Sequence, residues 1–158
     1  MDSRVKIFIE RGKTELKIAE TLFRLSNNAD EKTSLDIKED MTFYSAVISH
    51  SYYCIFYAAK AILMSKNIKT STPEVHKKTY EEFKRVFVDS GILDVELLRI
   101  YRKLVIRADE LLGIFKEEKW KRGHYTYKTI PQANKGPAEE SIENAKTFLS
   151  NIIMLIEA

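Results

Sequence analysis

The sequence predicts an all-α fold, a five-helix up-and-down bundle formed as a single domain over 1–158. Only five glycines and three prolines interrupt the chain, and the apolar residues between them recur every three or four positions, which is the helical period. Apolar residues make up 44% of the sequence and charged residues 31%, as in ordinary globular proteins. A chain of this length buries roughly 70% of its unfolded surface, enough for one core without disulfides or metals.

The first helix is expected from about residue 3 to residue 25. The segment 28–40 is polar and carries no apolar stripe, so we expect a long loop there. A second helix, over about 41–65, is apolar on nearly every side and should lie at the centre of the bundle. The buried stripe of the first helix steps by threes and fours and comprises Val5, Phe8, Gly12, Leu16, Ala19 and Leu22.

The other three helices are recognised from their ends. Thr72 precedes a proline, a combination typical of a cap and first turn, and begins the third helix. Asp94 should cap a fourth helix that continues to about residue 115. Glycines and prolines then predict an irregular basic and aromatic connection over 120–136. The fifth helix starts near Pro137, followed by acidic residues that suit a helix N-terminus.

Composition and missing motifs exclude several classes of protein. The net charge of +3 is too small to require nucleic acid or an anionic membrane as partner. Cys54 is the only cysteine and the N-terminus has no apolar signal core, so we expect a cytoplasmic protein. The apolar stretch 46–64 carries a histidine, tyrosines and a lysine that are costly in lipid, so no membrane span is expected. No metal-ligand spacing or phosphate-binding glycine loop occurs, and we expect neither metal nor cofactor.

One short segment, 116–128, concentrates candidate functional residues. Lysine and arginine neutralise phosphates and aromatic rings stack on bases, which are the contacts that single-stranded nucleic acid needs. A histidine there could also exchange protons near neutral pH. The alternative is a basic helix end whose rings pack on the bundle. The candidate binding residues are Lys119, Trp120, Arg122, Tyr125 and Tyr127, and the candidate proton carrier is His124.

A polar stripe on the central helix is the second candidate. His50, Tyr53, Tyr57 and Lys60 are spaced by three, four and three residues, so they should share one helix face. The stripe could line a nucleotide pocket or a subunit interface, because tyrosine buries a large area while keeping a hydroxyl to hydrogen-bond. Alternatively, these are satisfied polar groups at the edge of the core. For His76 we expect a packing or capping role rather than a ligand role.

The central helix contains the string Tyr-Tyr-x-x-Phe-Tyr-Ala-Ala at 52–59. This string resembles the signature helix of the HEPN family (higher eukaryotes and prokaryotes nucleotide-binding domain). Val75-His76-Lys77 and the Ser90-Gly91 turn are similar to the start and end of the next helix in that family. The resemblance extends to the C-terminus and implies a HEPN-type bundle. Its C-terminal matches are Arg122, Tyr127, Glu139, Glu140, Ala145, Phe148 and Leu149.

The resemblance implies a toxin–antitoxin setting. HEPN members include RNA-cleaving toxins and non-catalytic partners of small nucleotidyltransferases. Ribonuclease members carry an arginine followed after four to six residues by a histidine, and they place two copies face to face in a homodimer. Here each register holds half of that motif, since the fifth residue after Arg122 is Tyr127 and the fifth before His124 is Lys119. Either replacement weakens the motif, because lysine lacks the planar fork of arginine and tyrosine does not titrate near neutrality.

Three functional hypotheses follow from the broken motif. The first is a homodimeric module that binds nucleotide, RNA or a nucleotidyltransferase partner without strong cleavage of its own. The second is a metal-independent ribonuclease in which Arg122 and Lys119 hold the scissile phosphate, His124 shuttles protons, and Tyr125 or Tyr127 orients the base. The third is a dimeric helical scaffold with no ligand.

Overall fold

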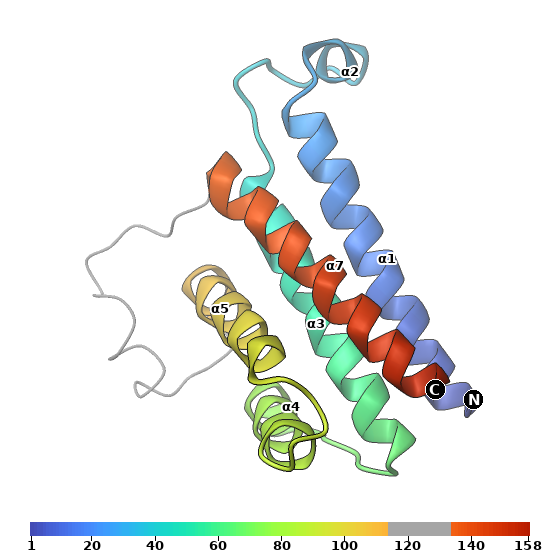
Figure 1. Cartoon of the computed structure of the whole chain (residues 1–158). Coiled ribbons are helices and arrows are strands. Elements are labelled where there is room, and N and C mark those ends of the chain that lie inside the picture. Colours follow the sequence, from blue (N-terminus) through green and yellow to red (C-terminus); the bar gives the residue numbers. More distant parts are fainter. Residues whose placement is uncertain (114–133) are drawn as a thin grey trace.

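A computed structural model describes residues 1–113 and 134–158 of the chain (Figure 1). These residues form six α-helices and one π-helical turn, and they contain no strand, so the all-α prediction is confirmed. The short additional helix that was not expected lies in the segment between the first two long helices. The elements are α1 (Ser3–Ser26), α2 (Ala29–Ser34), α3 (Tyr44–Ser65), α4 (Val75–Phe83), the π-helical turn η1 (Lys84–Val88), α5 (Val95–Leu112) and α7 (Lys135–Glu157).

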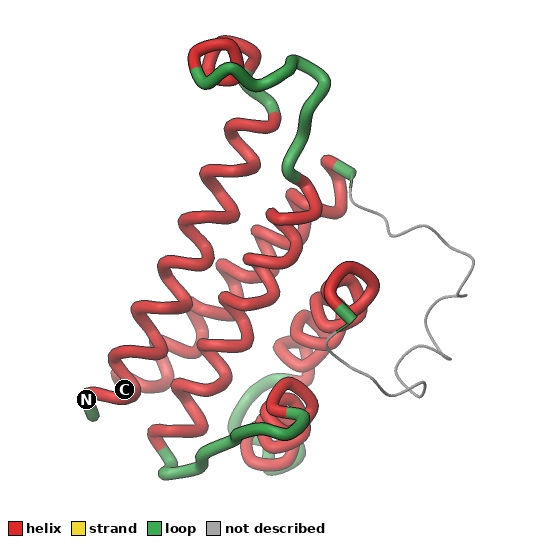
Figure 2. The backbone as a smooth tube through the Cα atoms, turned by 180° about the vertical axis from the view of Figure 1, so that it is seen from behind, coloured by secondary structure: helices red, strands yellow, loops and turns green. Residues whose placement is uncertain are grey.

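Helix α3 lies at the centre of the bundle, as its all-round apolarity predicts. It buries 13 of its 22 residues, which lets other helices pack on several of its sides. Helices α1 and α7 flank it, with α1 running in the opposite direction to α3 and α7, and α4 and α5 pack elsewhere on α3 (Figure 1). The two chain ends meet at the same end of the bundle (Figure 2). Among the residues that the structure describes, no helix is long and apolar enough to cross a membrane.

Helix α1 approaches α3 closely at Gly12, in the predicted stripe. A Cβ atom on Gly12 would lie 3.4 Å from the Cys54 carbonyl oxygen and 3.4 Å from Leu149 Cδ1. The stripe residues Val5 and Ala19 are buried on either side of this contact. Burial also raises the pKa of the Cys54 thiol to about 12, so the only cysteine is a packed core residue rather than a nucleophile.

The segment predicted as a long loop, 28–40, contains helix α2 instead. The Asn28 side chain accepts a hydrogen bond from the Glu31 amide at 3.0 Å and caps the helix. Lys32 is buried, and its Nζ donates to the Glu39 carbonyl at 2.8 Å, which ties the following residues back onto the helix. A helix of six residues needs only such local bonds, and it therefore leaves no apolar stripe in the sequence.

Three predicted helix ends need correction. Thr72 is not the cap of α4, which begins at Val75 after Glu74 adopts a left-handed conformation with φ of 58°. Helix α5 ends at Leu112 rather than near residue 115, because Gly113 is left-handed and its amide bonds back to α5. Helix α7 begins at Lys135, two residues before the start predicted near Pro137. Residues 120–133 of the predicted connection lie outside the described residues. The Asp94 cap is confirmed, since its Oδ1 accepts from the Glu96 amide at 2.9 Å.

Candidate functional site

The polar stripe of α3 is the predicted site that the structure describes. All four of its residues are half-buried, at an edge where side chains of α1 and α4 reach α3. The stripe consists of His50, Tyr53, Tyr57 and Lys60. The candidates of the basic segment, Lys119, Trp120, Arg122, His124, Tyr125 and Tyr127, lie outside the described residues.

His50 pairs with a carboxylate of α1. Its Nδ1 lies 2.5 Å from Glu15 Oε2, and about a third of the histidine side chain is exposed. The pair links the middle of α1 to the first half of α3. At this end of the stripe the polar groups satisfy each other, as the structural alternative proposed.

His76 of α4 binds the centre of the stripe through Tyr52. The Tyr52 hydroxyl lies 2.7 Å from His76 Nδ1, and the His76 ring packs 4.5 Å from Phe56 and edge-on to Tyr53 at 5.8 Å. Burial raises the pKa of Tyr52, whereas burial and the nearby charge of Lys60 lower the pKa of His76. Both groups are therefore neutral at pH 7, and the tautomer of His76 decides which of the two atoms donates.

Two cations lie on aromatic rings at the other end of the stripe. Lys60 Nζ lies 5.2 Å from the Phe8 ring centre and donates to the Thr70 carbonyl at 3.1 Å. The Arg11 guanidinium lies 5.5 Å from the Tyr57 ring centre. Neither Arg11 nor Lys60 forms an ion pair with any of the described residues. Burial, followed by the charge of Arg11, lowers the pKa of Lys60.

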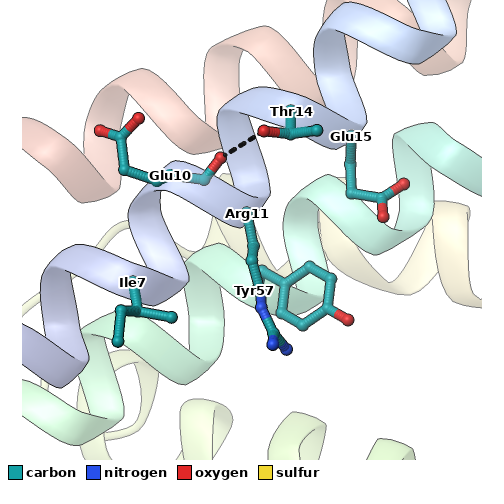
Figure 3. Close-up of a pocket in the computed structure, with 6 residues that line it drawn as sticks. All are labelled: Ile7, Glu10, Arg11, Thr14, Glu15 and Tyr57. Atoms are coloured by element: carbon teal, nitrogen blue, oxygen red, sulfur yellow. Dashed lines mark hydrogen bonds between the residues drawn. The ribbon is translucent and has the colours of Figure 1, made fainter.

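A pocket of about 370 Å³ opens between α1 and α3 beside Arg11 and Tyr57 (Figure 3). Arg11 extends alongside the Tyr57 ring, and Thr14 donates to the Glu10 carbonyl at 2.9 Å. Within 1–113 and 134–158, no group of His, Cys, Asp and Glu side chains is arranged to hold a metal ion. The pocket is lined by Ile7, Glu10, Arg11, Thr14, Glu15 and Tyr57.

Sequence reasoning missed the contribution of α1 and the role of Tyr52. Arg11 and Glu15 are four residues apart and so share one side of α1, but no pattern in the sequence shows that this side meets the stripe. Tyr52 appeared only as part of the aromatic string. We call the whole surface the α3 polar face; it comprises Arg11 and Glu15 of α1, His50, Tyr53, Tyr57 and Lys60 of α3, and His76 of α4.

The α3 polar face combines two kinds of binding chemistry. Half-buried tyrosine rings offer surfaces for bases or for partner side chains, and the two cations offer charge for phosphate or carboxylate groups. Tyrosine and arginine are also the residue types that dominate protein–protein interfaces. The face therefore suits either a nucleotide or a protein surface.

Comparisons with known proteins place the chain beside toxin-named proteins. The family model for the HEPN domain matches residues 5–153. "Putative toxin MJ0142" of Methanocaldococcus jannaschii is 34% identical over 97 residues, which are 60% of this chain and 58% of that protein. "Putative toxin MJ0605" of the same organism is 27% identical over 136 residues, 85% of this chain and 88% of that protein. The chain thus matches less than two thirds of the first relative, and no solved structure gives a significant match.

Proposed function

Because this chain belongs to the HEPN domain family, we propose that it is the toxin-type component of a toxin–antitoxin pair and binds nucleotide or RNA as a homodimer. The names of the two relatives support the toxin-type role. A small nucleotidyltransferase is the proposed protein partner, as the family resemblance implies. Residues 1–158 act as one HEPN-type domain in this proposal.

The observation that carries the binding proposal is the pairing of cations and rings on the α3 polar face. Arg11 and Lys60 have ring contacts and no carboxylate partner among the described residues. Such charges attract an anionic ligand, and the adjacent tyrosines supply stacking surfaces that tolerate any base. The sequence of the basic segment, which contains Trp120 and Arg122, also combines positive charges with aromatic rings.

Fluorescence anisotropy with a labelled single-stranded RNA tests the binding proposal. We expect the wild-type chain to bind, and the affinity to fall steeply as salt is raised from about 50 mM to about 200 mM, because binding releases counterions from phosphates. Trp120→Ala and Arg122→Ala should weaken binding if the basic segment takes part. Absence of binding even at the lower salt concentration would contradict the proposal.

A metal-independent ribonuclease is the second candidate, favoured by the toxin names of both relatives. In this alternative Lys119 and Arg122 hold the phosphate and His124 exchanges protons. The test is cleavage of a labelled RNA pool in the presence of a chelator by wild type, His124→Ala and Arg122→Ala, purified in parallel. Cleavage that disappears in both variants supports the ribonuclease. Cleavage that both variants retain is contamination and leaves the binding function.

A further inference from the structure

We infer that Arg11 and Lys60 form a phosphate-binding site for a nucleoside monophosphate, either free or at the end of an RNA strand. The inference deepens the proposed function and rests on it, because it assigns a ligand class to one end of the α3 polar face. It concerns described residues of α1 and α3 only. The basic segment beyond α5 plays no part in it.

The two cations lie over a connected group of aromatic rings. The Phe8 and Tyr57 rings are stacked, with centres 6.3 Å apart and planes 18° from parallel, and the Phe56 ring centre lies 5.4 Å from that of Tyr57. Lys60 Nζ is 5.2 Å from the Phe8 centre and 5.6 Å from the Phe56 centre, and Arg11 lies over Tyr57. Both positive charges therefore lie against one cluster of aromatic side chains from α1 and α3.

The two carboxylates that line the pocket contact other side chains. Glu15 pairs with His50 at 2.5 Å, and Glu10 pairs with Lys13 at 3.2 Å. Neither Glu10 nor Glu15 forms an ion pair with Arg11 or Lys60. Burial and, after it, the positive charge of Arg11 lower the pKa of Lys60, so the two charges repel each other. An anion bound near both cations would offset this repulsion.

A phosphate monoester fits this arrangement better than a single carboxylate. It carries up to two negative charges near neutral pH, which match the two cations. The planar fork of Arg11 can bind two phosphate oxygens at once, while Lys60 acts as a point charge. His76 is neutral at pH 7, because burial and Lys60 lower its pKa, and it adds no third charge.

The adjoining pocket gives room for the rest of a nucleotide. Its volume of about 370 Å³ falls within the roughly 300–1,000 Å³ typical of small-molecule sites. Thr14, Glu10 and Glu15 line it, and their side-chain oxygens can accept hydrogen bonds from ribose hydroxyls or base amino groups. Ile7 and Tyr57 provide its apolar surface (Figure 3).

Isothermal titration calorimetry on the full chain tests this site, with AMP, inorganic phosphate and adenosine as probes. We expect AMP to bind and adenosine to bind much more weakly. Arg11→Gln and Lys60→Met should each weaken AMP binding by about tenfold or more, since each removes a charged hydrogen-bond donor to phosphate. Lys17→Gln is the matched control, because Lys17 is an exposed cation that the helical period places on another side of α1.

The inference is overturned if both variants bind AMP as the wild type does, or if Lys17→Gln weakens binding equally, which would indicate an effect of net charge alone. Arg11 is exposed, so Arg11→Gln keeps the test valid even if Lys60→Met fails to fold. The RNA-binding assay separates this result from the proposed function. If the wild type binds RNA but not AMP, the site is overturned and the proposed function stands. If the wild type binds neither RNA nor AMP, both are overturned.

Discussion

At the scale of single residues, the hydrogen bond from Tyr52 to His76 joins the central helix to α4. The Tyr52 side chain is completely buried, and its hydroxyl reaches Nδ1 of a histidine that is only half-buried. The bond satisfies two polar groups that packing has removed from water. It also fixes the orientation of the His76 ring, because Nδ1 must face the buried hydroxyl.

Tyr52→Phe should destabilise the protein by about 1–3 kcal/mol, because it removes the hydroxyl that is hydrogen-bonded to Nδ1 of His76. The phenyl ring keeps the packing against Phe56 and Tyr53, so the substitution creates almost no cavity. Urea unfolding followed by circular dichroism measures the change. Tyr44→Phe is the control, since its hydroxyl contacts exposed Asn27 and its loss should change stability by less than about 0.5 kcal/mol. Equal effects of the two variants would contradict the expectation.

The lowered pKa of His76 predicts a pH dependence of stability. The unfolded chain, in which the pKa is near 6.5, binds the proton more readily than the folded protein. The free energy of unfolding should therefore fall as the pH decreases from about 6.5 through the lowered folded-state pKa, and this contribution is absent above that window. Denaturant titrations between about pH 7.5 and pH 5 measure the slope. His76→Gln should reduce the slope, and an unchanged slope would assign it to other histidines.

Residue spacing in the sequence predicted one helix face correctly but not its neighbours. The four stripe residues are all half-buried along one edge of α3, and their binding role stays a prediction. Their partners Glu15, Arg11 and His76 come from two other helices. Helical periodicity acts within a helix and carries no information on which sides of two helices meet, so these contacts required the structure.

At the scale of elements, the contact of α1 with α3 and α7 depends on the small residue Gly12. We expect Gly12→Ala to be tolerated and to stabilise the protein by roughly 0.5–1 kcal/mol, because its Cβ would make ordinary contacts and alanine favours a helix. Gly12→Leu should destabilise by about 1–3 kcal/mol, since its larger side chain would have to displace α3 or Leu149. Thermal unfolding of the two variants measures both effects. Similar stability in both would show that the helices can separate at little cost.

Helix α7 is anchored to α5 by Arg107. Its guanidinium donates to Glu140 Oε2 at 2.9 Å, to Ser141 Oγ at 3.2 Å and to the Pro137 carbonyl at 3.3 Å, and only 19% of its side chain is exposed. Hydrogen bonds from Arg107 and Lys103 lower the pKa of Glu140. These bonds fix the first turns of α7 immediately after the residues that lie outside the described part.

Arg107→Met should destabilise the protein by about 1–3 kcal/mol, because it removes charged hydrogen bonds from a half-buried position while keeping the apolar stem. Arg99→Met is the matched control on the same helix. Its ion pair with Glu96 is exposed on both sides, so we expect a change of less than about 0.5 kcal/mol. Urea unfolding measures both variants. An equally large loss of stability in Arg99→Met would mean that the positive charge of α5, and not the hydrogen bonds from Arg107 to α7, stabilises the protein.

Long helices were predictable from the sequence and short ones were not. Helices α1 and α3 match their predicted spans to within about three residues, because an amphipathic stripe or an apolar run marks their full length. Helix α2 depends on the Asn28 cap, and the start of α4 depends on the left-handed conformation of Glu74. A single residue with an unusual conformation leaves no periodic signal, so such boundaries are the weakest part of the prediction.

At the scale of the whole molecule, the central position of α3 in the bundle could be predicted from its apolar sequence. The sequence of α3 is apolar on nearly all sides, and the structure surrounds it with α1, α4, α5 and α7. The family resemblance is confirmed by the match over residues 5–153. The candidate site was predictable only in part, because three of its seven residues belong to α1 and α4 and because the basic segment lies outside the described residues.

The proposed homodimer predicts a mass near twice 18.4 kDa in light scattering. The α3 polar face was interpreted either as a subunit interface or as a ligand pocket, and the mass of variants distinguishes the two. If the face holds a phosphate ligand, Arg11 and Lys60 must stay accessible in the dimer. Arg11→Gln and Lys60→Met should then keep the dimer mass, and AMP should not change it.

The opposite pattern would assign the face to the dimer itself. Dissociation in the Arg11→Gln variant, or on addition of AMP, would mean that the second copy covers the two cations and competes with the ligand. Such competition would appear as a concentration-dependent affinity for AMP, because more protein favours the dimer. A monomer at every concentration would contradict the homodimer. It would leave the phosphate site intact, because both of its cations come from one copy of the chain.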